Sequence, residues 1–140
     1  MTVALLWPML AHIGWVFMLY AWLTVARTRA VKSGEIDNSC FVLGRDEPLP
    51  VARITRNLAN QFELPVMFYT LVVLLIVLGR VNWVDVAAAW AFVAGRVIHT
   101  LVQTLTDNVP LRGQVFMINF LAVVVLAAHV AMIAVEGVGR

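Results

Sequence analysis

The segment Arg53-Ile-Thr-Arg-Asn-Leu-Ala-Asn-Gln-Phe-Glu-Leu-Pro65 carries charged and amide side chains into an apolar stretch that continues to Gly79. Charges inside a membrane span are costly and are usually kept for function or for pairing with one another. On a helix that turns by about 100° per residue, Arg56, Asn60 and Glu63 lie within about 60° of one another. Such a polar stripe cannot face lipid, so it must face another helix, another subunit or a bound polar ligand.

The composition indicates an integral membrane protein. Hydrophobic residues make up 62% of the chain and charged residues only 13%, which is far from the average of soluble proteins. A hydrocarbon core about 30 Å thick needs about 20 helical residues to cross it. The apolar stretches that meet this length are residues 3–26, 53–79, 83–106 and 113–135. The sequence therefore predicts an all-α fold, an integral membrane four-helix bundle in which residues 1–140 form one four-span transmembrane domain.

The distribution of lysine and arginine predicts the orientation, because cytoplasmic loops are enriched in these residues. The larger group lies around the first loop and in the turn before the fourth span: Arg27, Arg29, Lys32, Arg45, Arg53 and Arg112. Arg80 and Arg140 lie on the opposite side. We therefore expect the first loop and the last turn in the cytoplasm and both termini outside. The basic residues are not interleaved with exposed aromatics, so nucleic acid is not an expected partner.

Cysteine and histidine leave few routes to thiol or metal chemistry. Cys40 is the only cysteine, so no internal disulfide and no cysteine-based metal site can form, and we interpret it as an ordinary loop residue. His12 and His129 are expected at similar depths, where two histidines could ligate a b-type haem. The interpretation that we favour is hydrogen bonding to neighbouring helices. No metal site is expected.

A second polar stripe lies on the third span, where Arg96, His99 and Gln103 share one helix face. Depths counted from the rise of 1.5 Å per residue align the two stripes. The expected partners in depth are Glu63 with Arg96, Asn60 with His99, and Arg56 with Gln103. We expect an ion pair between Glu63 and Arg96, because each charge would compensate the other near mid-membrane. The stripes would wall a polar crevice that opens to the cytoplasm. Polar side chains can also simply join helices, but their number here favours a ligand site.

Pro65 lies inside the second span and has no backbone N–H to donate. A proline at this position frees the carbonyl of Gln61 and predicts a kink just past Glu63.

The pattern Arg56-x3-Asn60-x2-Glu63-x-Pro65 resembles the second-helix signature of the MAPEG family, the membrane-associated proteins in eicosanoid and glutathione metabolism. Gly95-Arg-Val-Ile-His-Thr-Leu101 resembles the third-helix segment of the microsomal glutathione transferases in this family, and Arg112 resembles the arginine at the turn that follows. The resemblance covers essentially the whole chain. It implies a bacterial-type member in the inner membrane, a homotrimer of four-helix subunits, and glutathione bound between neighbouring subunits near the cytoplasmic face.

The resemblance also implies a role for each polar residue toward glutathione as co-substrate. Arg56 would grip a carboxylate, Asn60 would bind the peptide portion, and Glu63 would meet the amine. Arg112 would lie beside the sulfur as the catalytic residue, because a cation favours thiolate over thiol. The expected glutathione-binding residues are Arg27, Arg29, Arg53, Arg56, Asn60, Glu63, Arg96, His99 and Gln103.

The predicted function is a glutathione-dependent transferase or peroxidase that acts on hydrophobic electrophiles or lipid hydroperoxides. One residue departs from the family pattern, because relatives of this type carry a tyrosine on the third helix where this chain has Gln103, and no tyrosine follows Tyr69. The alternative is a non-catalytic member that binds a lipid or a partner membrane protein, or serves as an accessory of a larger membrane complex. The sequence leaves the identity of the second substrate open.

Overall fold

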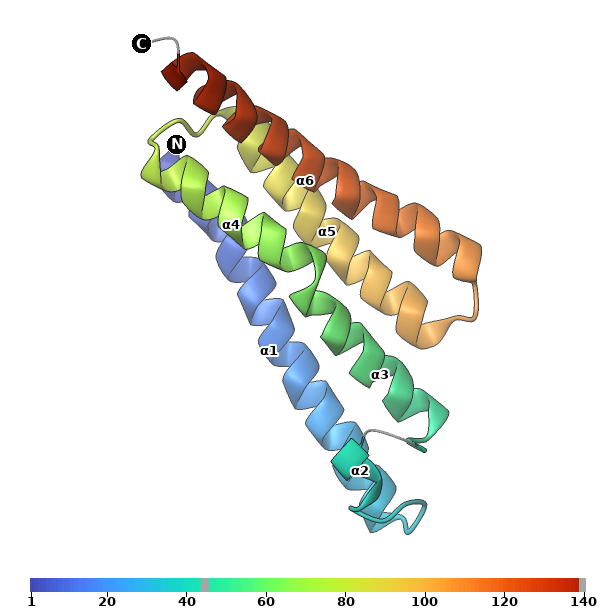
Figure 1. The fold of residues 1–140 in the computed structure, drawn as a ribbon. Coiled ribbons are helices and arrows are strands. Elements are labelled where there is room, and N and C mark those ends of the chain that lie inside the picture. Colours follow the sequence, from blue (N-terminus) through green and yellow to red (C-terminus); the bar gives the residue numbers. More distant parts are fainter. Residues whose placement is uncertain (44–45, 139–140) are drawn as a thin grey trace.

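A computed structural model describes residues 1–43 and 46–138, and this part of the chain is built of helices without a strand (Figure 1). The helices are α1 (Thr2–Lys32), α2 (Cys40–Leu43), α3 (Leu49–Ala59), the 3-10 turn η1 (Asn60–Phe62), α4 (Leu64–Val77), α5 (Trp83–Leu105) and α6 (Val109–Val138). Within the described residues, 4 helical segments are long and apolar enough to cross a membrane. The prediction of an all-α integral membrane four-helix bundle is confirmed. Arg45 and Arg140 lie outside the described residues.

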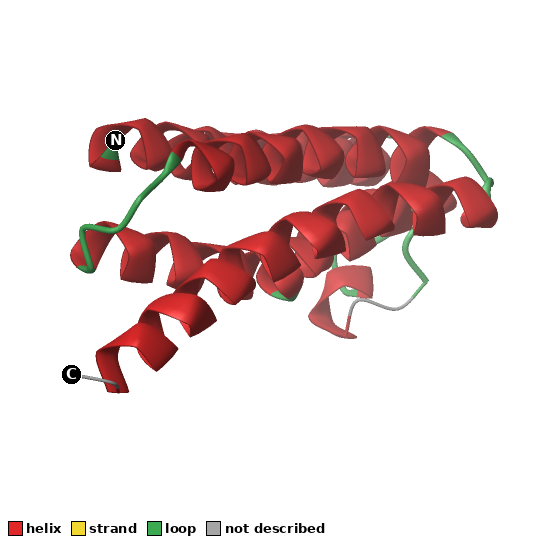
Figure 2. Ribbon diagram, turned by 90° about the horizontal axis from the view of Figure 1, so that it is seen from above, coloured by secondary structure: helices red, strands yellow, loops and turns green. Residues whose placement is uncertain are grey.

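The chain passes back and forth along the bundle, so its ends and turns gather at two opposite ends. Both termini and the link between α4 and α5 lie at one end (Figure 1). The first loop, which contains α2, and the turn between α5 and α6 lie at the other end. The long helices run alongside one another in this view and from above (Figure 2). The described members of the larger basic group, which are Arg27, Arg29, Lys32, Arg53 and Arg112, therefore lie at the end that carries α2.

Two apolar clusters hold the helices together. The cluster nearer the termini joins α1, α4, α5 and α6 through Leu5, Phe68, Val72, Leu75, Ala89, Phe92, Ala122, Val123 and Leu126. The rings of Phe68 and Phe92 stack in it with their centroids 4.1 Å apart. The second cluster joins α1 to α3 through Val16, Leu19, Leu23, Ala30, Val51, Ile54 and Leu58. Asn60, Gln61 and Glu63 lie between α3 and α4. They therefore separate the residues of the second span that belong to the two clusters, which end at Leu58 and resume at Phe68.

The second span breaks where the sequence predicts a kink. α3 ends at Ala59, η1 follows, and Glu63 leaves helical geometry with φ −99° and ψ −100° before α4 begins. Pro65 lies in the first turn of α4, where its missing N–H costs no helical hydrogen bond. The break is sharper than the expected kink, because a full 3-10 turn separates the two helices.

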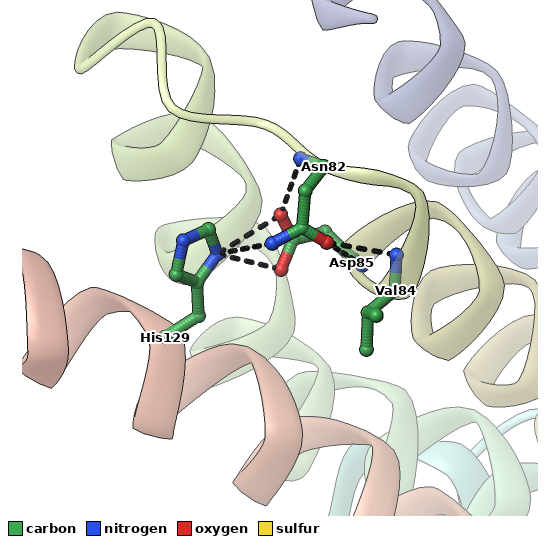
Figure 3. A network of polar contacts seen from close by, with 4 residues as sticks. All are labelled: Asn82, Val84, Asp85 and His129. Carbon is green, nitrogen blue, oxygen red and sulfur yellow. Dashed lines mark hydrogen bonds and ion pairs between the residues drawn. The ribbon is translucent and has the colours of Figure 1, made fainter.

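A capping box begins α5 at the end that carries the termini (Figure 3). The side chain of Asn82 accepts from the backbone N–H groups of Val84 and Asp85, and the Asp85 carboxylate accepts from the Asn82 N–H at 2.8 Å. His129 of α6 reaches the same carboxylate with its Nδ1, 2.9 Å from Oδ1. Asp85 thus begins α5 and joins it to α6.

The two histidines considered as haem ligands each contact a side chain of a neighbouring helix through Nδ1. Nδ1 of His129 meets Asp85, and Nδ1 of His12 lies 2.6 Å from the hydroxyl of Tyr69. The His12 ring also packs among Phe68 and Phe92. These contacts favour the interpretation that both histidines join neighbouring helices.

Candidate functional site

The polar side chains of the second and third spans form a hydrogen-bonded ring at the break. Arg96 donates from Nε to the Gln61 Oε1 at 3.1 Å and from Nη2 to the Asn60 carbonyl at 2.7 Å. Gln61 donates to the Asn57 side chain at 3.3 Å, and Asn57 donates to the Gln103 Oε1 at 3.0 Å. Asn60 donates to the same oxygen of Gln103 at 3.2 Å, which closes the ring.

The expected ion pair between Glu63 and Arg96 is not formed among the described residues, and this prediction is wrong. Arg96 is 1% exposed and directs its guanidinium to Gln61 and to the backbone of Asn60, whereas Glu63 is exposed. The predicted depth of the partner of Arg96 is nearly correct, because the observed partner, Gln61, lies only two positions before Glu63 in the chain. Glu63 lines the same cavity as Arg96, but the guanidinium of Arg96 is engaged by Gln61 and Asn60 instead.

A cavity of about 580 Å³ opens beside this ring. One part of its wall is polar and the other is apolar. The polar part consists of Asn60, Glu63, Arg96 and His99, and the apolar part of Leu64, Met67, Phe116 and Phe120. The Nδ1 atom of His99 is buried and has no hydrogen-bond partner within the described ranges. The cavity therefore offers polar groups to a ligand at the same place as an apolar surface.

A smaller pocket of about 130 Å³ adjoins the ring toward the turn between α5 and α6. Arg53, Arg56, Gln103 and Arg112 line it, together with Asp107 and other residues of that turn. Arg53 is paired with Asp107, so Arg56 and Arg112 are the arginines of this pocket without such a carboxylate among the described residues. Gln103 lines the small pocket and Asn60 lines the large cavity, so their hydrogen bond connects the two.

Arg27 and Arg29 lie away from this site in the single chain. Arg27 donates to the Glu47 carboxylate at 2.6 Å and to the Thr55 hydroxyl at 3.2 Å, and its guanidinium lies 4.9 Å from the centre of the Phe41 ring. It lines a separate pocket between α1 and α3. Arg29 lines another, with residues of the first loop and the end of α5. The structure therefore brings seven of the expected glutathione-binding residues and Arg112 together, and leaves Arg27 and Arg29 on other faces.

Three residues of the ring and its surroundings were not among the expected binding residues: Asn57, which belongs to the polar segment of the second span, Gln61 and Thr100. All three are at most 1% exposed. Thr100 donates to the Asn57 side chain at 2.9 Å, and Gln61 also donates to the Asn57 carbonyl at 3.1 Å. The signal was present, because Asn57 and Gln61 are four residues apart, as are Arg96 and Thr100, and residues at this spacing share a helix face.

Close packing of α5 against α6 sets the position of the cavity wall. A Cβ atom at Gly95 would overlap the Asn119 side-chain oxygen and lie 3.1 Å from its Cγ. Asn119 is 0% exposed, and its amide has no hydrogen-bond partner in residues 1–43 and 46–138. Gly95 therefore allows the approach of α6, which carries Phe116 and Phe120 to the cavity.

The described residues give no support for a reactive thiol or a metal site. Cys40 lies on α2, and burial together with the nearby carboxylates of Asp46 and Glu47 raises the pKa of its thiol. A raised pKa disfavours the reactive thiolate, in agreement with the interpretation of Cys40 as a loop residue. The described residues contain no cluster of three or more histidine, cysteine or carboxylate side chains that could hold a metal ion.

Comparison with known proteins gives one match. The model of the MAPEG family matches residues 5–132, which is most of the chain. No curated protein and no solved structure matches the sequence or the fold.

Proposed function

This chain belongs to the MAPEG family, and we propose that it is a glutathione-dependent transferase or peroxidase acting on hydrophobic electrophiles or lipid hydroperoxides. Family members commonly bind glutathione and form trimers. The observation that carries the proposal is the cavity of about 580 Å³, in which Asn60, Glu63 and Arg96 face apolar residues of α4 and α6. A reaction between a polar tripeptide and a lipophilic partner needs both surfaces in one place.

Glutathione carries two carboxylates and an ammonium group, and the site offers side chains of both opposite charges. Arg56 in the small pocket suits a carboxylate, since a guanidinium can bind it through two parallel hydrogen bonds. Glu63 in the large cavity suits the ammonium group. Asn60 lies between the two pockets and suits the peptide portion. The tripeptide would thus lie along the ring, with its ends in different pockets.

Arg112 is proposed to act on the sulfur. It lines the small pocket beside Arg56 and Gln103, and a nearby cation favours the thiolate form of a bound thiol. In the transferase reaction the thiolate sulfur forms a bond to an electrophilic carbon, and the leaving group departs with its electron pair. In the peroxidase reaction two glutathione molecules are oxidised to the disulfide while the hydroperoxide is reduced to an alcohol and water.

The single chain leaves the site open in a way that a homotrimer would close. Arg56 and Glu63 are exposed on the second span, where unpaired charge facing lipid is costly. A neighbouring subunit would cover them and bring its own α1, with Arg27 or Arg29, toward the tripeptide. We therefore propose a homotrimer of four-span domains in a bacterial inner membrane, with the α2 end in the cytoplasm and both termini outside.

The alternative function is a non-catalytic member that binds a lipid or a membrane partner. One observation favours it: the ring contains amide side chains where relatives carry a tyrosine hydroxyl, and the hydroxyl of Tyr69 is engaged by His12.

Calorimetry with glutathione, paired with turnover of a chromogenic electrophile and of a lipid hydroperoxide, tests the proposal on the purified protein. Binding with turnover supports the enzyme. Binding without turnover of either substrate supports the non-catalytic alternative. Absence of binding contradicts every role for glutathione here.

A further inference from the structure

The donor and acceptor ends of each amide in the ring beside the two pockets can be assigned, because some groups in the ring can only donate a hydrogen bond and others can only accept one. The Arg96 guanidinium can only donate, so the atom of Gln61 that meets Arg96 Nε at 3.1 Å must be an oxygen. The backbone carbonyl of Asn57 can only accept, so the atom of Gln61 that meets it at 3.1 Å must be the nitrogen. Two independent contacts therefore orient the Gln61 amide the same way.

This orientation passes to the next members of the ring. Because the Gln61 nitrogen donates to the Asn57 side-chain oxygen at 3.3 Å, the Asn57 nitrogen is left to donate to Gln103 at 3.0 Å. The atom of Gln103 that receives it is therefore an oxygen, and it also accepts from the Asn60 nitrogen at 3.2 Å. Each amide has one donor end and one acceptor end, so no member can turn over without breaking its neighbours' hydrogen bonds.

Two amide atoms remain without a hydrogen bond inside the ring, the side-chain nitrogen of Gln103 and the side-chain oxygen of Asn60. The Gln103 nitrogen donates to no group in the described part of the chain. It is also not fully buried, so a ligand could reach it. The same holds for the side-chain oxygen of Asn60. Gln103 lines the small pocket with Arg56 and Arg112, and Asn60 lines the large cavity with Glu63.

We propose that this ring sets the polarity of the ligand site: Gln103 presents its NH₂ group as a donor to an anionic group in the small pocket, and Asn60 presents its carbonyl oxygen as an acceptor in the large cavity. Gln103 and Asn60 are then binding residues of opposite character. Arg96, Gln61 and Asn57 are positioning residues that act through them. The inference rests on the proposed function in taking glutathione as the ligand, whose carboxylate or thiolate fits the first pocket and whose ammonium or amide N–H fits the second.

The proposed donor and acceptor match the charged side chains of the pocket that each one faces. The small pocket combines the Gln103 donor with the guanidinium groups of Arg56 and Arg112, which favour negative charge. The Asp107 carboxylate of the same pocket is paired with Arg53. The cavity beside it combines the Asn60 acceptor with the Glu63 carboxylate, which favour a positive or N–H-bearing group. Arg96 also lines this cavity, but its guanidinium donates to Gln61 and to the Asn60 carbonyl. A ligand with one anionic and one cationic end would therefore bind in a single direction.

Selective ¹⁵N labelling of glutamine tests the orientation directly, because Gln61, Gln103 and Gln114 are the glutamines of the chain. Hydrogen exchange of their side-chain NH₂ groups is measured by NMR on the whole protein in detergent micelles. Gln61 is buried with its nitrogen bonded twice, and Gln114 is exposed. We expect the Gln61 NH₂ group to exchange at least about tenfold more slowly than that of Gln103. Equal protection of the two would overturn the proposal.

Added glutathione extends the same measurement. The Gln103 NH₂ signal should shift on titration, while the signals of Gln61 and Gln114 stay in place. A protein that binds glutathione by calorimetry but leaves the Gln103 signal unmoved would contradict the donor role of Gln103. If calorimetry shows no binding, the proposed function fails, and the exchange rates still decide the orientation of the ring.

A pair of substitutions separates binding from folding. Gln103→Glu keeps an oxygen for the donors of Asn57 and Asn60 but removes the donor toward the small pocket. It should keep the melting temperature near that of the wild type and weaken glutathione binding at least about tenfold. Gln103→Leu removes the acceptor and should lower the melting temperature. If Gln103→Glu melts as early as Gln103→Leu, the nitrogen of Gln103 faces the asparagines and the proposed orientation is wrong.

Discussion

The guanidinium of Arg96 donates to the backbone carbonyl of Asn60 at 2.7 Å, at the point where the second span breaks. In a continuous helix this carbonyl would accept from the N–H group of Leu64. Because unsatisfied backbone groups are costly within a membrane, a buried arginine at the break has a structural role as well as a place in the candidate site. Arg96 therefore connects the shape of the second span to the position of Asn60 in the cavity.

Replacing Arg96 by methionine should destabilise the protein strongly. The change leaves two acceptors, the Gln61 side-chain oxygen and the Asn60 carbonyl, without this donor in a buried site. Each such loss costs about 1–3 kcal/mol. Thermal unfolding in mild detergent measures it, with Arg96→Lys as the control that retains a positive charge but lacks the paired geometry of the guanidinium. An unfolding temperature unchanged in Arg96→Met would show that the break does not depend on Arg96.

Glu63→Gln should have little effect on stability, because Glu63 is exposed and forms no ion pair with Arg96 among the described residues. The expected change in the free energy of unfolding is under about 1 kcal/mol, as for other exposed charges. Glutathione binding should weaken, since the carboxylate is proposed to meet the ammonium group. A double-mutant cycle with Arg96→Met should be near additive in unfolding free energy. A coupling energy above about 1 kcal/mol would indicate that Glu63 and Arg96 do form an ion pair, which would contradict this prediction.

Arg112→Ala should separate thiol ionisation from glutathione binding. Negative charge resides on the sulfur only after ionisation, so loss of Arg112 should raise the pKa of the bound thiol and lower turnover while affinity stays nearly the same. Titration of the thiolate's ultraviolet absorbance against pH reads the pKa directly. Arg80→Ala is the matched control, because Arg80 lies at the opposite end and pairs with Glu136. An unchanged titration would leave Arg112 as a charge that serves only the orientation in the membrane.

Gly95→Ala should loosen the contact between α5 and α6. Its Cβ atom would overlap the buried side chain of Asn119, and overpacking of this kind costs about 1–3 kcal/mol. Gly113→Ala is the control, because a Cβ there has no neighbouring atom within 4 Å. Thermal unfolding of Gly95→Ala combined with Asn119→Ala should recover most of the loss. A failure to recover would mean that the contact with Asn119 is not the cause.

The helices and the class of protein could be predicted from the sequence, and so could the break near Pro65. Long apolar stretches in lipid must satisfy their backbone hydrogen bonds internally, so length and hydropathy determine where such helices run. A proline inside one of them removes an N–H regardless of what surrounds it. The approximate depth of each polar residue followed from the helical rise, which is why the stripes of the second and third spans lie opposite each other.

The atoms that meet across the helices could not be predicted in this way. The 3-10 turn at Asn60–Phe62 changes the angle at which side chains leave the second span, so Gln61 and not Glu63 accepts a hydrogen bond from Arg96. The direction of each amide in the ring likewise depends on contacts between residues that are about 40 positions apart in the chain. Sequence by itself determined the spans, their polar faces and the place of the break, because these depend on local backbone chemistry. Only the tertiary structure decided which polar groups pair and which remain for a ligand, because that choice depends on the rotation of one helix against another.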